Sequence, residues 1–123
     1  MAAKRIFLLS GHNAFREALA LLLNEMSDLE VVSQAGSLAE VGNVNLDHNI
    51  DVALVDLSLS DGEGMALIRE LSTEHGDAVA LGMSSVSGPS IIERALGAGA
   101  ARVLATSSSL EEIVNAIRSS ARG

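Results

Sequence analysis

The chain has no cysteine, no tryptophan and no tyrosine, and it contains one proline and two phenylalanines. Without cysteine it can form no disulfide framework, no thiolate zinc site and no cysteine nucleophile, so a cytoplasmic protein is expected. Aromatic residues make up 2% of a chain that is 48% hydrophobic, and the core must therefore be built from leucine, valine, isoleucine and alanine. A length of 123 residues predicts one domain over residues 1–123.

Basic side chains are also scarce, with 8 lysines and arginines against 16 aspartates and glutamates and a formal net charge of −8. Phosphate contacts need clustered basic residues, so we expect no direct nucleic-acid binding by this segment. The apolar run at residues 6–9 is too short for a signal peptide or a membrane span, and no membrane association is expected. Phosphate-loop, nucleophile-elbow and dinucleotide motifs are absent, and no nucleophile–base pair or metal cluster is evident, so we expect no enzyme.

Five short apolar runs recur along the chain, at residues 5–9, 30–35, 51–56, 78–83 and 102–105. Because they are apolar almost throughout, they favour strands of a parallel sheet covered on both faces. The segments between them carry apolar residues at helical spacing: Phe15, Leu19, Leu22, Leu23 and Met26; Met65, Ile68 and Leu71; and Leu110, Ile113, Val114 and Ile117. The alternation predicts an α/β fold, a (βα)5 flavodoxin-like three-layer sandwich with a parallel five-stranded sheet in the order 2-1-3-4-5.

Ser-x-x-Glu patterns mark three predicted helix starts, in which the serine hydroxyl satisfies an unpaired backbone amide and the glutamate reaches back. They are Ser37/Glu40, Ser90/Glu93 and Ser109/Glu112. Pro89 is expected just before the second of these helices.

Asp56 is the first candidate site residue, because it closes the apolar run 52–55 and a lone buried carboxylate is costly. In a sheet of this order, ligands bind beyond the carboxyl ends of the strands, between strands 1 and 3. The same edge would carry Ser10 and Gly11 after strand 1, Ser84 after strand 4 and Thr106 after strand 5. The alternative is that Asp56 only caps the loop that follows it.

Several segments resemble response-regulator receiver domains. Residues 51–64 look like the segment around the phospho-acceptor aspartate of that family, residues 95–104 like the approach to its last strand, and residues 109–123 like its final helix. His12 and Arg16-Glu17 are similar to the start of helix 1 in the LuxR/NarL-type subfamily. The resemblance implies a two-component phosphorelay with Asp56 as phospho-acceptor and a histidine kinase as partner. We expect no output domain within these 123 residues.

The same resemblance shows where the chain departs from the family. It places Ser84 at the switch hydroxyl position, but Ser10 and Gly11 at the acidic pair and Thr106 at the lysine position. The family's acidic pair and phospho-acceptor hold Mg²⁺, so here Mg²⁺ binding is expected to be weak, through Asp56 if at all. Phosphorylation of Asp56 is accordingly expected to be atypical.

Two further hypotheses concern the loops after strands 3 and 4. Asp61 or Glu63 is a candidate substitute metal ligand, and the alternative is a solvated acidic loop. In the same loop, Ser60 replaces the family's proline. The serines 84, 85, 87 and 90 form a hydroxyl-rich stretch that would suit a small anion or simply a flexible connection. The alternative function is a phosphorylation-independent pseudo-receiver that acts through dimerisation, a partner or a ligand.

Dimerisation is expected through helix 4, strand 5 and helix 5, the face that receiver domains often use. Any apolar excess left exposed there would form a patch suited to a two-fold interface. The candidate residues are Ile91, Ile92, Ala100, Ala101, Val103 and Leu104.

Overall fold

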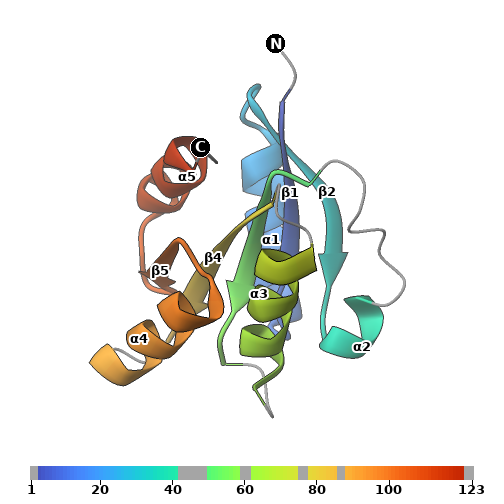
Figure 1. Cartoon of the computed structure of the whole chain (residues 1–123). Helices are drawn as coiled ribbons and strands as arrows, with labels where there is room; N and C mark the ends of the chain where they lie inside the picture. The colour runs from blue at the N-terminus through green and yellow to red at the C-terminus, as the bar shows by residue number, and fades with distance from the viewer. Residues whose placement is uncertain (1–2, 42–49, 59–61, 75–77, 86–87, 121–123) are drawn as a thin grey trace.

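The computed structural model describes residues 3–41, 50–58, 62–74, 78–85 and 88–120. Strands and helices alternate along these residues (Figure 1). The strands are β1 (Lys4–Leu9), β2 (Leu29–Ala35), β3 (Val52–Asp56), β4 (Val79–Ser84) and β5 (Arg102–Ala105). The helices are α1 (Asn13–Asn24), α2 (Leu38–Val41), α3 (Glu63–Glu74), α4 (Pro89–Ala98) and α5 (Leu110–Ser119).

The strands form one parallel sheet in the order β2-β1-β3-β4-β5, which is the order predicted for a flavodoxin-like fold. Each strand begins and ends within one residue of its predicted bounds. β3 lies in the middle of the sheet and, like β4, is buried at every residue, which places Asp56 at the end of a fully enclosed strand.

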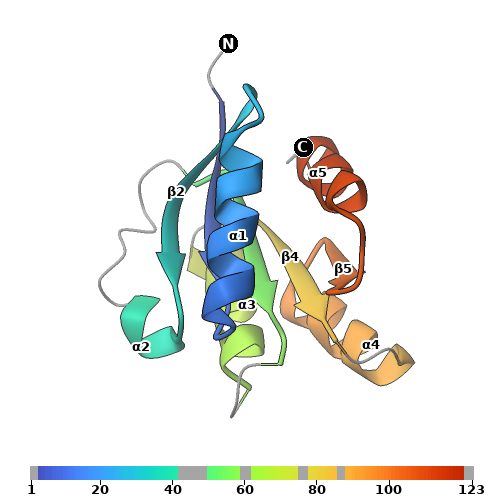
Figure 2. The same cartoon turned by 180° about the vertical axis from the view of Figure 1, so that it is seen from behind.

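Helices cover both faces of the sheet, which explains why the central strands β3 and β4 are apolar almost throughout rather than alternating. α1 and α5 pack on one face, and α2, α3 and α4 on the other (Figures 1 and 2). Successive residues of β1 enter opposite cores: Ile6 and Leu8 pack with α1 and α5, and Phe7 and Leu9 with α3. The three-layer prediction is confirmed.

The apolar stripe predicted for α1 is wrong at one position. Leu22 is 41% exposed and its neighbour Leu21 is 70% exposed. The buried face of the helix is centred on Leu19, Ala20 and Leu23, which leaves Leu22 at its edge. The stripes of α3 and α5 are buried as predicted, except that Leu110, at the start of α5, is only half-buried.

The predicted helix starts have different outcomes. Ser109 forms the complete capping box with Glu112, whereas Ser37 accepts a bond from the amide of Glu40 while the Glu40 carboxylate reaches Gly36. The predicted Ser90/Glu93 capping box and the predicted position of Pro89 before the helix are both wrong. α4 begins at Pro89, its N-cap is Gly88, and Ser90 lies inside the helix. Proline suits the first helical position because its fixed φ matches the helix and no amide hydrogen is needed there.

Candidate functional site

The carboxyl ends of β1, β3, β4 and β5 meet at one edge of the sheet. Ser10, Asp56 and Ser84 lie there, and they are the buried polar residues of the described part of the chain, with exposures of 5%, 5% and 6%. Thr106 is half-buried, and its amide donates to the carbonyl of Ser84 at 3.0 Å. Four of the residues singled out in the sequence therefore lie at the same edge.

Three neutral groups hold the Asp56 carboxylate. The Ser10 hydroxyl donates to Oδ2 at 3.1 Å, and the amide and hydroxyl of Ser58 donate to Oδ1 at 2.8 and 2.6 Å. The bond from the amide two residues on is the Asx-turn expected if Asp56 caps its loop. The contact with Ser10, 46 residues away, goes beyond that local role and ties β1 to β3.

Gly11 is exposed and offers no side chain to this edge. Within the described residues, no group of three or more histidine, aspartate or glutamate side chains is placed to hold a metal ion. Asp61 and Ser60 lie outside the described residues. The Glu63 carboxylate accepts a bond of 2.6 Å from the amide of Leu38, the first residue of α2, where it complements the helix N-terminus.

Gly64 is a site residue whose role sequence reasoning misses. It is the second residue of α3 and is buried. A Cβ at this position would lie 2.5 Å from the carbonyl oxygen of Asp56. Only glycine lets the first turn of α3 pack this closely on the end of β3.

Arg16 is a second residue whose role was missed, since only its likeness to the LuxR/NarL-type subfamily pointed to it. Its Nη1 donates to the carbonyl of Ser10 at 2.6 Å and to Asn13 at 2.9 Å, and its Nε donates to Gln34 at 3.2 Å. The amide of His12, the N-cap residue of α1, donates to the Ser10 hydroxyl at 3.2 Å. Arg16 therefore fixes the loop that presents Ser10 to Asp56.

A cavity of about 680 Å³ opens next to this edge. It lies between the first half of α1 and the residues that follow β1, β3, β4 and β5. Asp56, Ser10, Ser58 and Thr106 line it together with apolar side chains of the sheet and of α1. The strand order predicts a ligand site at this edge, but no sequence pattern indicates that the cavity extends along the first half of α1.

The serine-rich stretch after β4 does not act as one unit in the described residues. Ser84 is buried, Ser85 is exposed and lines the cavity, and Ser90 is part of α4. Ser87 lies outside the described residues.

The predicted dimer face is only partly exposed. Ala100 and Leu104 belong to the core, and Ile91 and Val103 are half-buried. Ala101 is exposed, and among the larger side chains Ile92 is 39% exposed and Leu96, which the sequence analysis did not include, 46%. The apolar surface of α4 is thus narrower than predicted and centred on Ile92 and Leu96.

The sequence matches the response regulator receiver domain family over residues 6–118, and the chain belongs to that family. It is 27% identical over 119 residues to the transcriptional regulatory protein LiaR of Bacillus subtilis, covering 97% of this chain and 56% of that protein. It is 34% identical over 96 residues to the DNA-binding transcriptional activator DevR/DosR of Mycobacterium tuberculosis, covering 78% and 44%. A LuxR-family two-component response regulator from Aurantimonas superposes with a TM-score of 0.85 at 26% identity, covering 95% and 84%.

These similarities confirm the resemblance to LuxR/NarL-type receiver domains. The chain spans about half the length of the curated relatives it matches. No helix in the described parts of the chain has the length and apolar character needed to cross a bilayer.

Proposed function

We propose that this chain is the signal-receiving domain of a two-component response regulator in which Mg²⁺-assisted phosphorylation of Asp56 has been lost or greatly weakened. Its role is regulatory rather than enzymatic, its place is the cytoplasm, and its partner is a histidine kinase or another signalling protein. The observation that carries the proposal is the hydrogen bonding of Asp56, where Ser10 supplies a hydroxyl at a position that carries a carboxylate in the family.

The charges at the site support this proposal. Mg²⁺ requires oxygen ligands in near-octahedral geometry and is usually bound through carboxylates together with phosphate oxygens and waters. Ser10 and Gly11 bring no charge, and Asp56 is the one carboxylate among the described residues that line the cavity at this edge. Thr106 cannot provide the charge-assisted hydrogen bond that a lysine gives to a phosphoryl group. The residues present do not fit a resident Mg²⁺.

Phosphotransfer to Asp56 with Ser84 as the switch hydroxyl is the second candidate. It is favoured by the burial of both side chains at the ends of the neighbouring strands β3 and β4. A phosphoryl group at Asp56 would add negative charge and acceptor oxygens at this edge. It would also have to displace the bonds from Ser10 and Ser58.

The test is an amide NMR titration with millimolar Mg²⁺ and then beryllofluoride, which mimics an aspartyl phosphate. We expect no saturable shifts in the natural chain. Saturable shifts around Asp56, Ser84 and β5 that are absent from Asp56→Ala would contradict the proposal and support the second candidate.

A gain-of-function variant checks which positions matter. Ser10→Asp, Gly11→Asp and Thr106→Lys together restore the family's acids and lysine, and this triple variant is expected to bind beryllofluoride in the presence of Mg²⁺. No gain in binding by a folded triple variant would count against the roles assigned to these three positions.

A homodimer through α4, β5 and α5 is part of the proposal. It is supported by Ile92 and Leu96, which lie four residues apart on α4 and so share one exposed face. Sedimentation velocity should show a dimer that Leu96→Glu weakens. Leu21→Glu on α1 serves as the matched control, and dissociation by Leu21→Glu alone would move the interface to α1.

A further inference from the structure

The cavity beside Asp56 has the size and lining of a small-molecule site. Its volume of about 680 Å³ lies within the range of about 300–1,000 Å³ that such sites occupy. Leu8 and Leu54 of the sheet and Phe15 and Leu19 of α1 form apolar walls. Residues of this kind favour an apolar body, since burying it removes apolar surface from water.

The family's two acidic positions and its lysine position all carry small residues in this chain. Ser10 and Thr106 line the cavity themselves, and Gly11 follows Ser10 directly. Where the family carries two acids, this chain has the hydroxyl of Ser10 and the single hydrogen atom of Gly11. Where the family carries a lysine, this chain has the hydroxyl of Thr106. The smaller side chains thus leave space for a ligand in the cavity beside Asp56. The replacement of the lysine also leaves the Asp56 carboxylate without a cationic side chain from that position.

Asp56 places a negative charge at one end of the cavity. It is 5% exposed, and the three donors that the described residues supply to its carboxylate are neutral. Oδ2 accepts a bond from Ser10 and can accept one more, because a carboxylate oxygen has two lone pairs. The guanidinium of Arg16, which also lines the cavity, is engaged with Ser10, Asn13 and Gln34.

We propose that this cavity binds a small organic cation with an apolar ring system. The ring lies between α1 and the sheet, and a protonated amine donates to Oδ2 of Asp56. A cation compensates the cost of a buried carboxylate, which an anion would increase. The formal net charge of −8 attracts a cation to the chain as well.

Tryptamine is a suitable probe, because the chain contains neither tryptophan nor tyrosine and the indole fluorescence of the ligand has no protein background. Fluorescence anisotropy should show saturable 1:1 binding. Indole-3-propionate has a similar shape but a carboxylate, and it should bind at least about tenfold more weakly. Absence of saturable tryptamine binding, or equal affinity for both probes, would overturn the proposal.

Two pairs of variants locate the site. Asp56→Asn removes the charge and should weaken tryptamine about tenfold, whereas Glu17→Gln removes a charge on α1 outside the cavity lining and should not. Ala14→Phe puts a ring into the lining, and the matched Ala18→Phe changes an exposed residue of the same helix outside it. Ala14→Phe should abolish binding and Ala18→Phe should preserve it. Tryptamine binding that Asp56→Asn and Ala14→Phe both leave unchanged would overturn the assignment, and circular dichroism checks that each variant is folded.

The inference rests on the proposed function in one respect, namely that no Mg²⁺ or phosphoryl group occupies Asp56. The two experiments separate the claims. Beryllofluoride binding together with tryptamine binding would overturn the proposed function and leave the cavity proposal standing. Failure of both probes to bind would overturn the cavity proposal alone.

Discussion

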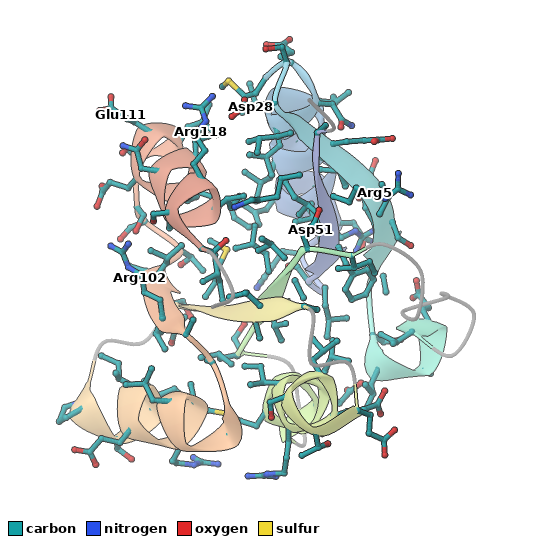
Figure 3. All side chains as sticks on the ribbon, turned by 45° about the horizontal axis from the view of Figure 1, so that its top comes forward. Arg5, Asp28, Asp51, Arg102, Glu111 and Arg118 are labelled. Carbon is teal, nitrogen blue, oxygen red and sulfur yellow. The ribbon has the colours of Figure 1, made fainter. Side chains whose placement is uncertain are left out.

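The guanidinium of Arg118 on α5 donates two hydrogen bonds, of 2.7 and 2.9 Å, to the carboxylate of Asp28 in the turn before β2 (Figure 3). This bidentate pair joins residues 90 positions apart, and it connects the last turn of α5 to the amino-terminal end of β2. Lys4 reinforces the contact, because its Nζ donates to the carbonyls of Ile117 at 3.0 Å and Ser120 at 2.6 Å. These bonds add a donor to carbonyls at the end of α5, where the carbonyl of Ile117 also accepts from the amide of Ser120.

The ion pair between Asp28 and Arg118 predicts that the stability of the fold depends on pH. The hydrogen bond from Arg118 holds the pKa of Asp28 below its ordinary value of 3.8, and the same bond raises the pKa of Arg118. Because the folded-state pKa of Asp28 is depressed, the pair contributes stability above pH 3.8 and loses it as the pH falls through the folded-state pKa. Both side chains are about half exposed, so the contribution is small and is screened by salt.

Carboxyl NMR titration measures this directly. The Asp28 pKa should lie below 3.8 in the natural chain and return toward 3.8 in Arg118→Gln. An Asp28 carboxyl that titrates at the same pH in both proteins would show that the pair does not persist in solution.

Gly64 and Gly97 predict opposite effects of the same substitution. The Cβ of Gly64→Ala would lie 2.5 Å from the Asp56 carbonyl oxygen, so a backbone must move and we expect a loss of about 2 kcal/mol or more in the free energy of unfolding. Gly97 lies in α4 with nothing within 4 Å of its Cβ position. Gly97→Ala should gain about 0.5–1 kcal/mol, because alanine loses less entropy in a helix.

Urea unfolding of both variants provides the measurement. Equal stability of Gly64→Ala and Gly97→Ala would mean that α3 does not pack on the end of β3 as the structure shows.

Ser10→Ala tests the bond between β1 and β3. The change removes the donor to Oδ2 of Asp56 and the acceptor for the amide of His12, so we expect a loss of about 1–2 kcal/mol in the free energy of unfolding. Ser107→Ala removes an exposed hydroxyl in the loop after β5 and should stay within about 0.5 kcal/mol of the natural chain. If the two variants are equally stable, the Ser10 hydroxyl does not contribute to holding Asp56.

The order of the strands and the convergence of Ser10, Asp56, Ser84 and Thr106 could be predicted from the sequence. Buried parallel strands must be apolar along their whole length, so their bounds and the polar residues at their carboxyl ends are visible as breaks in hydropathy. The sheet order then brings those ends together at one edge.

The close approach of Gly64, the contacts of Arg16 and the cavity could not be predicted in this way. Each depends on how closely neighbouring elements pack in space, on which the local sequence pattern carries no information. The exposure of Leu22 is of the same kind, since helical spacing defines a stripe but not which part of it faces the sheet.

The two serines at predicted helix starts provide the last test. Ser109 accepts a bond of 3.1 Å from the amide of Glu112 at the start of α5, and the Glu112 carboxylate accepts from the Ser109 amide at 3.1 Å. Ser109→Ala should therefore lower the free energy of unfolding by about 1 kcal/mol. Ser90 has the same Ser-x-x-Glu pattern but lies inside α4, after Pro89, so Ser90→Ala should be neutral or slightly stabilising because alanine has the higher helix propensity. Thermal or urea unfolding distinguishes the two, and a loss of about 1 kcal/mol in Ser90→Ala would instead place the start of α4 at Ile91, with Ser90 as its cap.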